Sequence, residues 1–179
     1  MTLAWGIFEA DGATFDLSHL DQAITSIEIG GEEHAILVEF SDHCFTEEAV
    51  ADDPRPKFTP STRTDGRFCE KRYQASLDIW EHIERAMKGP VWLGEDDRCL
   101  IVKVGEGENP MHYVIPFTLQ RWKGDERAKL KMRVRSAFIR DSGDRVATFG
   151  QVRFATLVQL TLKGKSPTRN YDRIRKRPW

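Results

Sequence analysis

The sequence predicts an α+β protein in which an antiparallel β-sheet packs on one main amphipathic helix. Short runs of alternating apolar and polar residues, separated by glycine or proline, occur in both halves of the chain. One longer stretch, residues 68–87, instead carries apolar residues three and four positions apart. With 179 residues, of which 40% are hydrophobic, the chain is long enough to bury a core of its own.

The N-terminal third predicts two β-hairpins followed by a loop. Asp11-Gly12 and Gly30-Gly31 are dipeptides that favour tight turns between strands. Residues 46–64 combine acidic residues with three prolines, which supply no backbone donor, and therefore indicate a long exposed loop. The predicted strands are residues 6–8, 13–15, 24–29 and 34–40.

The following residues predict the helix and then a four-stranded antiparallel meander. Gly89-Pro90 ends the helix. Its apolar stripe comprises Tyr73, Ser76, Leu77, Trp80, Ile83, Ala86 and Met87. The strands of the meander are residues 98–104, 111–122, 130–140 and 151–163.

Charge is divided unevenly along the chain. Residues 1–97 hold 8 of the 27 Lys/Arg but 21 of the 28 Asp/Glu, and residues 98–179 hold the rest. Such asymmetry indicates a polyanionic partner, or one half of the chain that shields the other. We expect an acidic β-rich segment, 1–66, to form one domain with a helix-plus-sheet segment, 67–163, and a basic tail, 164–179, to follow.

The third strand of the predicted meander has one apolar and one cationic face. The apolar face carries Leu130, Met132, Val134, Ser136 and Phe138, and the other carries Lys131, Arg133, Arg135, Ala137 and Ile139. If the helix covers the apolar face, His112 and Thr118 of the preceding strand line the open face with Arg133 and Arg135. Lys103 is the further candidate for this face.

These residue types match the needs of one reaction, the cleavage of RNA by its own 2′-hydroxyl. That reaction requires a base, a cation near the phosphorane and an acid for the leaving oxygen. His112 is the candidate base or acid, with His82 as its partner, and the candidate phosphate ligands are Arg133, Arg135 and Lys103. His82 lies about 200° around the helix from Trp80, which weakens its assignment. The alternative is a solvated sheet face with one incidental histidine.

The chain carries two separate resemblances. The layout of residues 68–163, a helix and then four antiparallel strands with His, Lys/Arg and Ser/Thr on the open face, resembles the barnase-EndoU-colicin-RelE class of metal-independent ribonucleases. This resemblance implies a ribonuclease of the toxin or defence effector type that needs neither metal nor cofactor. The segments Asp16-Leu17-Ser18-His19-Leu20 and Phe40-Ser41-Asp42-His43-Cys44-Phe45-Thr46 resemble uncharacterised proteins carried on bacterial mobile elements, a family that lends no established chemistry.

Ser41-Asp42-His43-Cys44 is a second candidate site, because it contains a carboxylate, an imidazole and a thiol. Sequential residues rarely align for in-line proton transfer, so adjacency argues against a Cys-His-Asp triad. The alternative is a strand that ends in a polar turn, with Asp42 accepting backbone donors and Cys44 buried. His19 has a similar alternative, an ordered turn or helix cap.

The three cysteines, Cys44, Cys69 and Cys99, are too few and too widely spaced for a disulfide framework and indicate reduced thiols. A zinc site that combines them with His43 is the alternative, although the chain has no paired ligand motif.

The basic tail and Lys131 are the candidate nucleic-acid contacts. Cations dominate the tail, and two aromatic residues can stack on bases. The tail residues are Lys163, Lys165, Arg169, Tyr171, Arg173, Arg175, Lys176, Arg177 and Trp179. The alternatives are a solubilising tail, or an arm that lies across the acidic segment from Asp42 to Asp53.

Two classes of function therefore stay open. The first is a metal-independent endoribonuclease, acting on RNA more than on DNA, and the second is a non-enzymatic module that binds nucleic acid, a protein or a second copy of the chain. No apolar run approaches the ~20 residues of a membrane span, so we expect no membrane partner. The N-terminus does not resemble a secretory signal, so the expected location is the cytoplasm.

Overall fold

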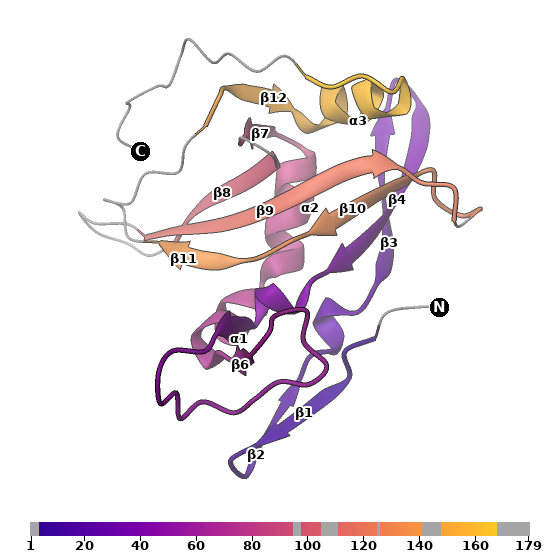
Figure 1. Ribbon diagram of the computed structural model, residues 1–179. Helices are drawn as coiled ribbons and strands as arrows, with labels where there is room; N and C mark the ends of the chain where they lie inside the picture. Colours follow the sequence, from indigo (N-terminus) through magenta and orange to yellow (C-terminus); the bar gives the residue numbers. More distant parts are fainter. Residues whose placement is uncertain (1–3, 95–97, 105–110, 125, 141–147, 168–179) are drawn as a thin grey trace.

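The computed structural model describes residues 4–94, 98–104, 111–124, 126–140 and 148–167. Within them the chain forms one large mixed sheet, two small two-stranded sheets and three α-helices, which confirms the α+β class (Figure 1). The strand order of the large sheet is β12-β7-β8-β9-β10-β4-β3, with β11 also paired to β9. None of the helices in these residues is long and apolar enough to cross a membrane.

Both predicted N-terminal hairpins are present. β1 (Ile7–Ala10) pairs with β2 (Ala13–Asp16), and β3 (Ala23–Ile29) pairs with β4 (Glu32–Phe40). Gly30 and Gly31 have φ of 63° and 83°, the conformation that a tight hairpin turn needs and that glycine adopts without steric cost. The turn chemistry of the sequence therefore sets both hairpins.

A four-stranded antiparallel meander follows the helices, but its members differ from the prediction. It consists of β7 (Pro90–Leu93), β8 (Arg98–Val104), β9 (Met111–Arg121) and β10 (Leu130–Val134). β4 joins the meander by pairing parallel to β10, with Phe40 opposite Val134. The acidic N-terminal segment thus contributes two strands to the same sheet as the basic segment.

The predicted strand 130–140 is interrupted. Residues 135–137 are irregular, and β11 (Phe138–Arg140) pairs with β9 beyond the break. The alternation predicted from β10 is therefore wrong after Val134: Ala137 is buried, whereas Ser136 lines an open pocket.

The predicted fourth strand, 151–163, is mostly a helix. Only β12 (Gln151–Arg153) is extended, and it pairs with β7, while α3 (Phe154–Leu162) continues from it. Phe154, Leu157 and Val158 are its buried residues, and their spacing of three and four positions gives a helix one apolar face. The β-branched residues of this segment favour a strand, but burial of that face outweighs their preference.

The predicted helix 68–87 is divided into two. α1 (Glu70–Ser76) and α2 (Ile79–Met87) are separated at Leu77, which is 46% exposed and not part of a buried stripe. The Ser76 hydroxyl donates to the Tyr73 carbonyl at 2.7 Å, a side-chain bond that competes with helix continuation. Phe68 belongs to β6 (Gly66–Phe68) and not to a helix. Its partner strand, β5 (Thr46–Glu48), lies in the segment predicted as a loop.

Helices α2 and α3 pack on one face of the large sheet, and the site lies on the other. The His82 ring of α2 lies 5.6 Å from the Tyr113 ring of β9, and Phe154 of α3 lies 6.1 Å from Phe117 of the same strand. A second part of the core, rich in aromatic rings, lies between α1 and the β1-β2 hairpin (Figure 1). It comprises Trp5, Phe8, Phe15, Phe45, Phe58, Phe68 and Tyr73.

A candidate anion-binding pocket

The segment after β4 folds as a short 3₁₀ turn that directs one side chain outward. The turn is η2 (Asp42–Cys44), and Ser41 caps it by accepting from the His43 backbone N–H at 3.2 Å. Asp42 and Cys44 face inward and are fully buried, whereas His43 is partly exposed. This arrangement confirms the prediction of a polar turn at the end of a strand.

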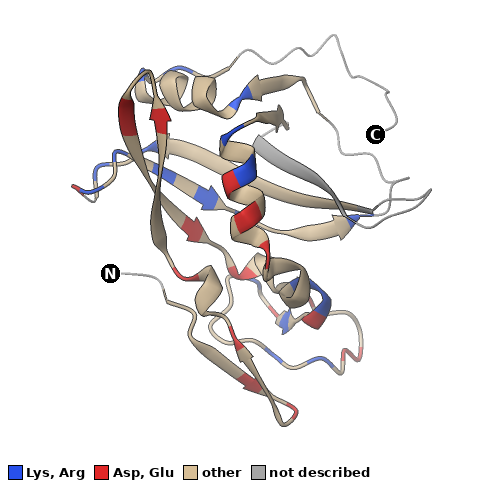
Figure 2. Cartoon of the chain, turned by 180° about the vertical axis from the view of Figure 1, so that it is seen from behind, with Lys and Arg blue, Asp and Glu red and all other residues tan. Residues whose placement is uncertain are grey.

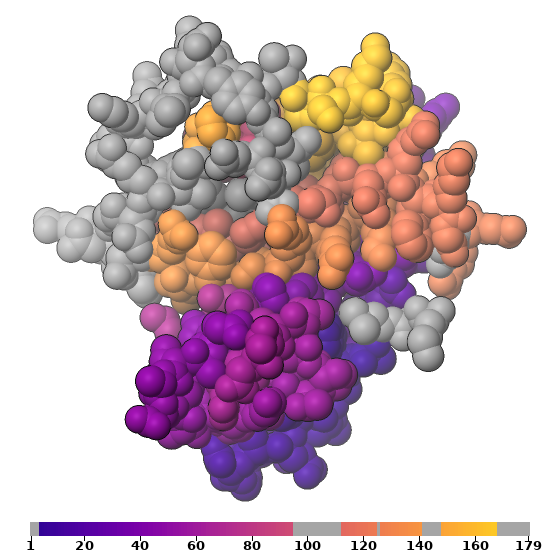
Figure 3. Space-filling view, viewed as in Figure 1, coloured from indigo at the N-terminus to yellow at the C-terminus, as the bar shows by residue number. Residues whose placement is uncertain are grey.

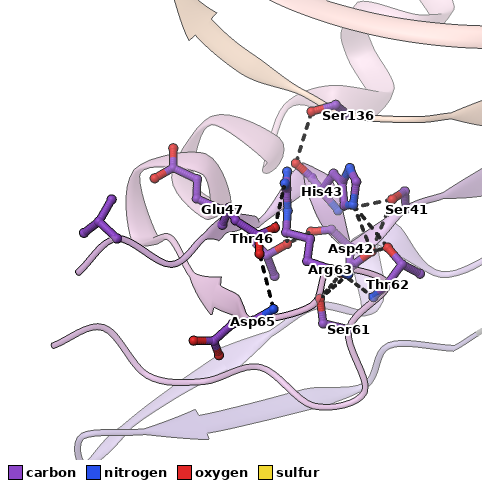
Figure 4. Close-up of polar contacts among 12 residues, drawn as sticks. Ser41, Asp42, His43, Thr46, Glu47, Ser61, Thr62, Arg63, Asp65 and Ser136 are labelled. Atoms are coloured by element: carbon purple, nitrogen blue, oxygen red, sulfur yellow. Dashed lines mark hydrogen bonds and ion pairs between the residues drawn. The ribbon is translucent and has the colours of Figure 1, made fainter. Parts of the chain in front are cut away.

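Buried Asp42 is the anchor of this turn (Figure 4). It accepts hydrogen bonds from the Ser61 hydroxyl at 2.5 Å, from the Thr62 backbone N–H at 3.0 Å and from the Thr62 hydroxyl. Burial raises the pKa of this carboxyl, but the hydrogen bonds from Ser61 and Thr62 outweigh burial and hold the pKa below its usual value. Asp42 is therefore ionised at neutral pH and fixes the loop 61–62 beside His43.

Thr62 links the carboxylate to the imidazole. Its Oγ1 lies within hydrogen-bond distance of Asp42 Oδ1 and 3.2 Å from His43 Nε2, whereas Nε2 is 4.0 Å from Asp42 Oδ1. An ionised carboxylate can only accept, so the Thr62 hydroxyl donates to Asp42 and accepts from His43 Nε2–H. In the neutral ring this leaves Nδ1 unprotonated.

The surroundings of His43 keep its imidazole neutral. Burial lowers its pKa, and the nearby positive charge of Arg63 lowers it further, against the opposing effect of Asp42. Arg72 and Arg135 act in the same direction as Arg63. His43 is thus an imidazole base in a cationic environment.

Cys44 cannot serve as the nucleophile of a triad with His43. Its thiol is fully buried, and burial raises its pKa to about 12. The sulfur therefore packs as a small apolar group, and the Cys-His-Asp hypothesis is wrong.

His43 opens onto a pocket shared with the basic part of the sheet. The pocket has a volume of about 400 Å³ and is lined by Ser41, His43, Thr62, Pro116, Arg133, Arg135 and Ser136. It forms because the parallel pairing of β4 with β10 continues one residue further, with Ser41 N–H donating to the Val134 carbonyl at 3.0 Å. The space-filling view shows this junction of residues near 40–75 with the strands of residues 130–140 (Figure 3).

Arg72 of α1 holds the two sides of the pocket together. Its Nη1 donates to the His43 carbonyl at 2.8 Å and to the Ser136 hydroxyl at 3.2 Å, and its Nε donates to Glu47 Oε1 at 3.0 Å. Ser136 also donates to the His43 carbonyl, at 3.3 Å. The turn and the irregular segment 135–137 are therefore fixed relative to each other.

The structure divides the predicted catalytic residues between two separate places. His112 is only 3% exposed, and its neighbours in register are Lys103 and Arg140. Arg133 lies opposite Thr118, six residues along β9 from His112, or about 20 Å at 3.4 Å per residue.

His82 packs against Tyr113, whose side chain lies on the opposite face of β9 from that of its neighbour His112, so the predicted partnership of the two histidines is wrong. The Lys103 side chain lies outside the described residues. Arg133 and Arg135 do line one pocket, but with His43.

The predicted nucleic-acid contacts separate into three groups. Lys131 is paired with Glu39 and lies 4.3 Å above the Trp122 ring, and only 14% of its side chain is exposed. Lys163 and Lys165 are exposed beyond α3. The predicted contacts Arg169, Tyr171, Arg173, Arg175, Lys176, Arg177 and Trp179 lie outside the described residues.

No group of three or more His, Cys, Asp or Glu side chains in the described part of the chain could hold a metal ion. Cys44 and Cys69 are buried free thiols, and the Cys99 side chain is outside that part.

Fold and pocket define an α+β protein with a cationic pocket between an N-terminal turn and the open face of its main sheet. The chain belongs to the YjaZ family, whose family model matches residues 7–162, from the first residue of β1 to the last residue of α3. Comparison with curated proteins and with solved structures finds no match.

Proposed function

We propose that the chain binds the phosphate backbone of nucleic acid, RNA in preference to DNA, in the pocket between His43 and Arg135. The observation that carries the proposal is the convergence of one imidazole, two guanidinium groups and three hydroxyls on one open cavity. Guanidinium groups bind phosphate through paired hydrogen bonds. The three hydroxyls fix the walls of the pocket, since each already donates to Asp42 or to the His43 carbonyl. The three hydroxyls belong to Ser41, Thr62 and Ser136.

The preference for RNA follows from the protonation of His43. Thr62 holds the Nε2–H, so the unprotonated Nδ1 can accept a hydrogen bond from a 2′-hydroxyl. DNA lacks this group, and the 2′-hydroxyl is what separates the two nucleic acids at a given site. The cations of the tail, 164–179, add salt-dependent affinity in this proposal.

Metal-independent cleavage of the bound RNA is the second candidate function. It is favoured by the neutral imidazole of His43 in the same pocket as Arg133 and Arg135. In this reaction His43 takes the proton of the 2′-hydroxyl while the arginines stabilise the phosphorane. The likeness to the barnase-EndoU-colicin-RelE class, and a role as toxin or defence effector of a mobile element, belong to this candidate.

The test is to measure binding of a fluorescent oligoribonucleotide to the full chain and to two variants, His43→Ala and Arg135→Ala. We expect Arg135→Ala to weaken binding about tenfold, and His43→Ala to reduce the preference for RNA over the matched DNA. Arg85→Ala and His34→Ala are the matched controls, since both side chains lie outside the pocket. Unchanged affinity in Arg135→Ala contradicts the proposal.

Cleavage is tested with the same RNA in EDTA. The ribonuclease candidate predicts products with a 2′,3′-cyclic phosphate that His43→Ala does not form. If the chain binds RNA but forms no products, the non-enzymatic function is favoured. If His43→Ala still forms the products, His43 is not the base. Removal of residues 168–179 tests the tail separately, because loss of its phosphate contacts lowers the salt dependence of binding.

A further inference from the structure

A second pocket adjoins the first. It has a volume of about 380 Å³, and Ser136 lines both pockets. The other residues around it are Glu47, Lys71, Arg72, Phe138, Ile139 and Arg140. Because the two pockets share a residue, they lie side by side.

The second pocket carries net positive charge. Glu47 is its acidic side chain, but Arg72 and Arg55 already hold that carboxylate. Burial raises the pKa of Glu47, and the hydrogen bonds from the two arginines outweigh burial and lower it. Lys71 and Arg140 are the other cations on the walls of the pocket, and within the described residues no carboxylate forms an ion pair with either.

An aromatic ring lies between the cations. The Arg140 guanidinium carbon is 5.1 Å from the centre of the Phe138 ring, and that of Arg72 is 5.6 Å from it. A guanidinium beside an aromatic ring is a planar surface on which unpaired bases stack. The second pocket thus offers both a phosphate site and a base site.

Each pocket has its own cations. Arg135 lines the first pocket and Arg140 the second, five residues further along a chain that spans at most about 16 Å over that length. A ligand that occupies both sets of cations at once carries a phosphate for each. It also needs an unstacked base, which a double helix does not present.

We propose that the two pockets form one groove for single-stranded RNA, in which successive phosphates bind beside Arg135 and beside Lys71 and Arg140, and a base stacks at Phe138. This inference rests on the proposed phosphate binding at the first pocket. It assigns the ligand as a single-stranded oligonucleotide and not a mononucleotide or a duplex.

The test compares the affinity of the full chain for hexa-adenylate RNA with its affinity for adenosine monophosphate. We expect the wild-type chain to bind the hexamer at least tenfold more tightly than the mononucleotide. In the double variant Lys71→Ala/Arg140→Ala and in Phe138→Leu this ratio falls towards one. Arg85→Ala, on the helix face of the molecule, keeps the wild-type ratio.

If Lys71→Ala/Arg140→Ala and Phe138→Leu both keep the wild-type ratio of the two affinities and still bind the mononucleotide, the inference is overturned. Absence of binding to either ligand by the wild-type chain overturns the proposed function itself, so the two failures are distinguishable. Tighter binding of the hexamer duplexed with oligouridylate overturns the single-stranded assignment. If hexaglutamate binds as tightly as hexa-adenylate and the same variants weaken its binding, the groove binds acidic peptide. That result overturns the RNA assignment.

Discussion

The loop 46–67 and the segment 133–140 are both rich in charge, but they use it in opposite ways. In the loop the cations are paired locally: Arg55 with Asp53 and Glu47, Arg67 with Asp65, and Arg63 with Glu48. In the segment 133–140, three arginines line the two open pockets. A count of charges along the sequence therefore does not locate a binding surface, because it does not show which cations line a pocket.

Acidic and cationic residues lie largely on different elements of the described part of the chain. Figure 2 shows acidic residues spread over the strands of the N-terminal half and over α2, and cationic residues on β10. Glu39 joins the two sets, since it pairs with Lys131 and lies 3.9 Å from Arg133. Side-chain exposure follows this pairing, since 54% of Arg133 is exposed against 14% of Lys131.

The largest expected effect is a loss of stability on removal of Asp42, the buried carboxylate that anchors the turn. Asp42→Ala removes a buried acceptor of several hydrogen bonds and leaves the donors of Ser61 and Thr62 without their partner. We expect a loss of about 3 kcal/mol in the free energy of unfolding, measured with urea. Glu81→Gln, in an exposed pair on α2, is the control and leaves the unfolding midpoint almost unchanged. Equal midpoints for both variants contradict the anchoring role of Asp42.

A matched pair of arginines separates the two regions. Arg133→Ala weakens RNA binding about tenfold, equivalent to about 1.4 kcal/mol, without a comparable loss of stability. Arg55→Ala has the reverse profile, because its side chain holds Asp53 and Glu47 together. Fluorescence anisotropy and urea unfolding of both variants check this. If both variants change RNA affinity and stability in the same way, the distinction between the arginines of the loop and the arginines of the pocket is contradicted.

The stability of the chain is expected to depend on pH through His43. The pKa of His43 is below its ordinary value of 6.5, so between these two values the folded chain binds fewer protons than the unfolded chain. Stability therefore rises as pH increases through this window and is complete above 6.5. Burial lowers the pKa of His19 and His82 as well, so all three histidines share this effect on stability.

We expect RNA affinity to change with pH in the opposite direction, and we assign this pH dependence to His43. Protonation of the imidazole adds a positive charge to the pocket, so affinity increases as pH falls through the same window. His43→Gln flattens the pH dependence of affinity, measured by anisotropy from pH 5 to 8. His82→Gln, on the other face of the sheet, leaves it intact. A dependence that survives His43→Gln assigns the titration to another group.

The smallest expected effect comes from Glu39, which contacts cations of the basic half. Glu39→Gln removes the negative charge beside Lys131 and Arg133. We expect RNA affinity to rise two- to threefold at low salt, or about 0.5 kcal/mol, and the gain to fade as salt increases. Glu28→Gln on β3 is the control. A decrease in affinity contradicts the view that Glu39 competes with phosphate for Arg133.

Much of the fold is predictable from the sequence, because its signals are local. The hairpins β1-β2 and β3-β4 follow from their turn dipeptides, and β8 and β9 follow from alternation and from the break between them. The helix α3 was also readable in principle, since Phe154, Leu157 and Val158 have helical spacing. The β-branched residues of the same segment favour a strand, so the local signals conflict.

The site was only partly predictable, because its two sides meet through a non-local contact. Arg133, Arg135 and His43 are each visible as chemical candidates, but nothing in the sequence places His43 beside the arginines. That contact depends on the parallel pairing of β4 with β10, which joins residues 36–40 to residues 130–134. His112 was favoured because it shares a strand face with cations, and its burial could not be read from the alternation.

The most direct test of the pocket follows the histidine ring signals of the full chain by NMR while a short single-stranded RNA is titrated. We predict that the His43 signals shift on binding and that its pKa rises towards or above 6.5, because a phosphate beside the ring stabilises the imidazolium. The signals of His19 and His82 stay in place. Saturation of the chain with RNA while the His43 signals and pKa remain unchanged contradicts the assignment of this pocket as the binding site.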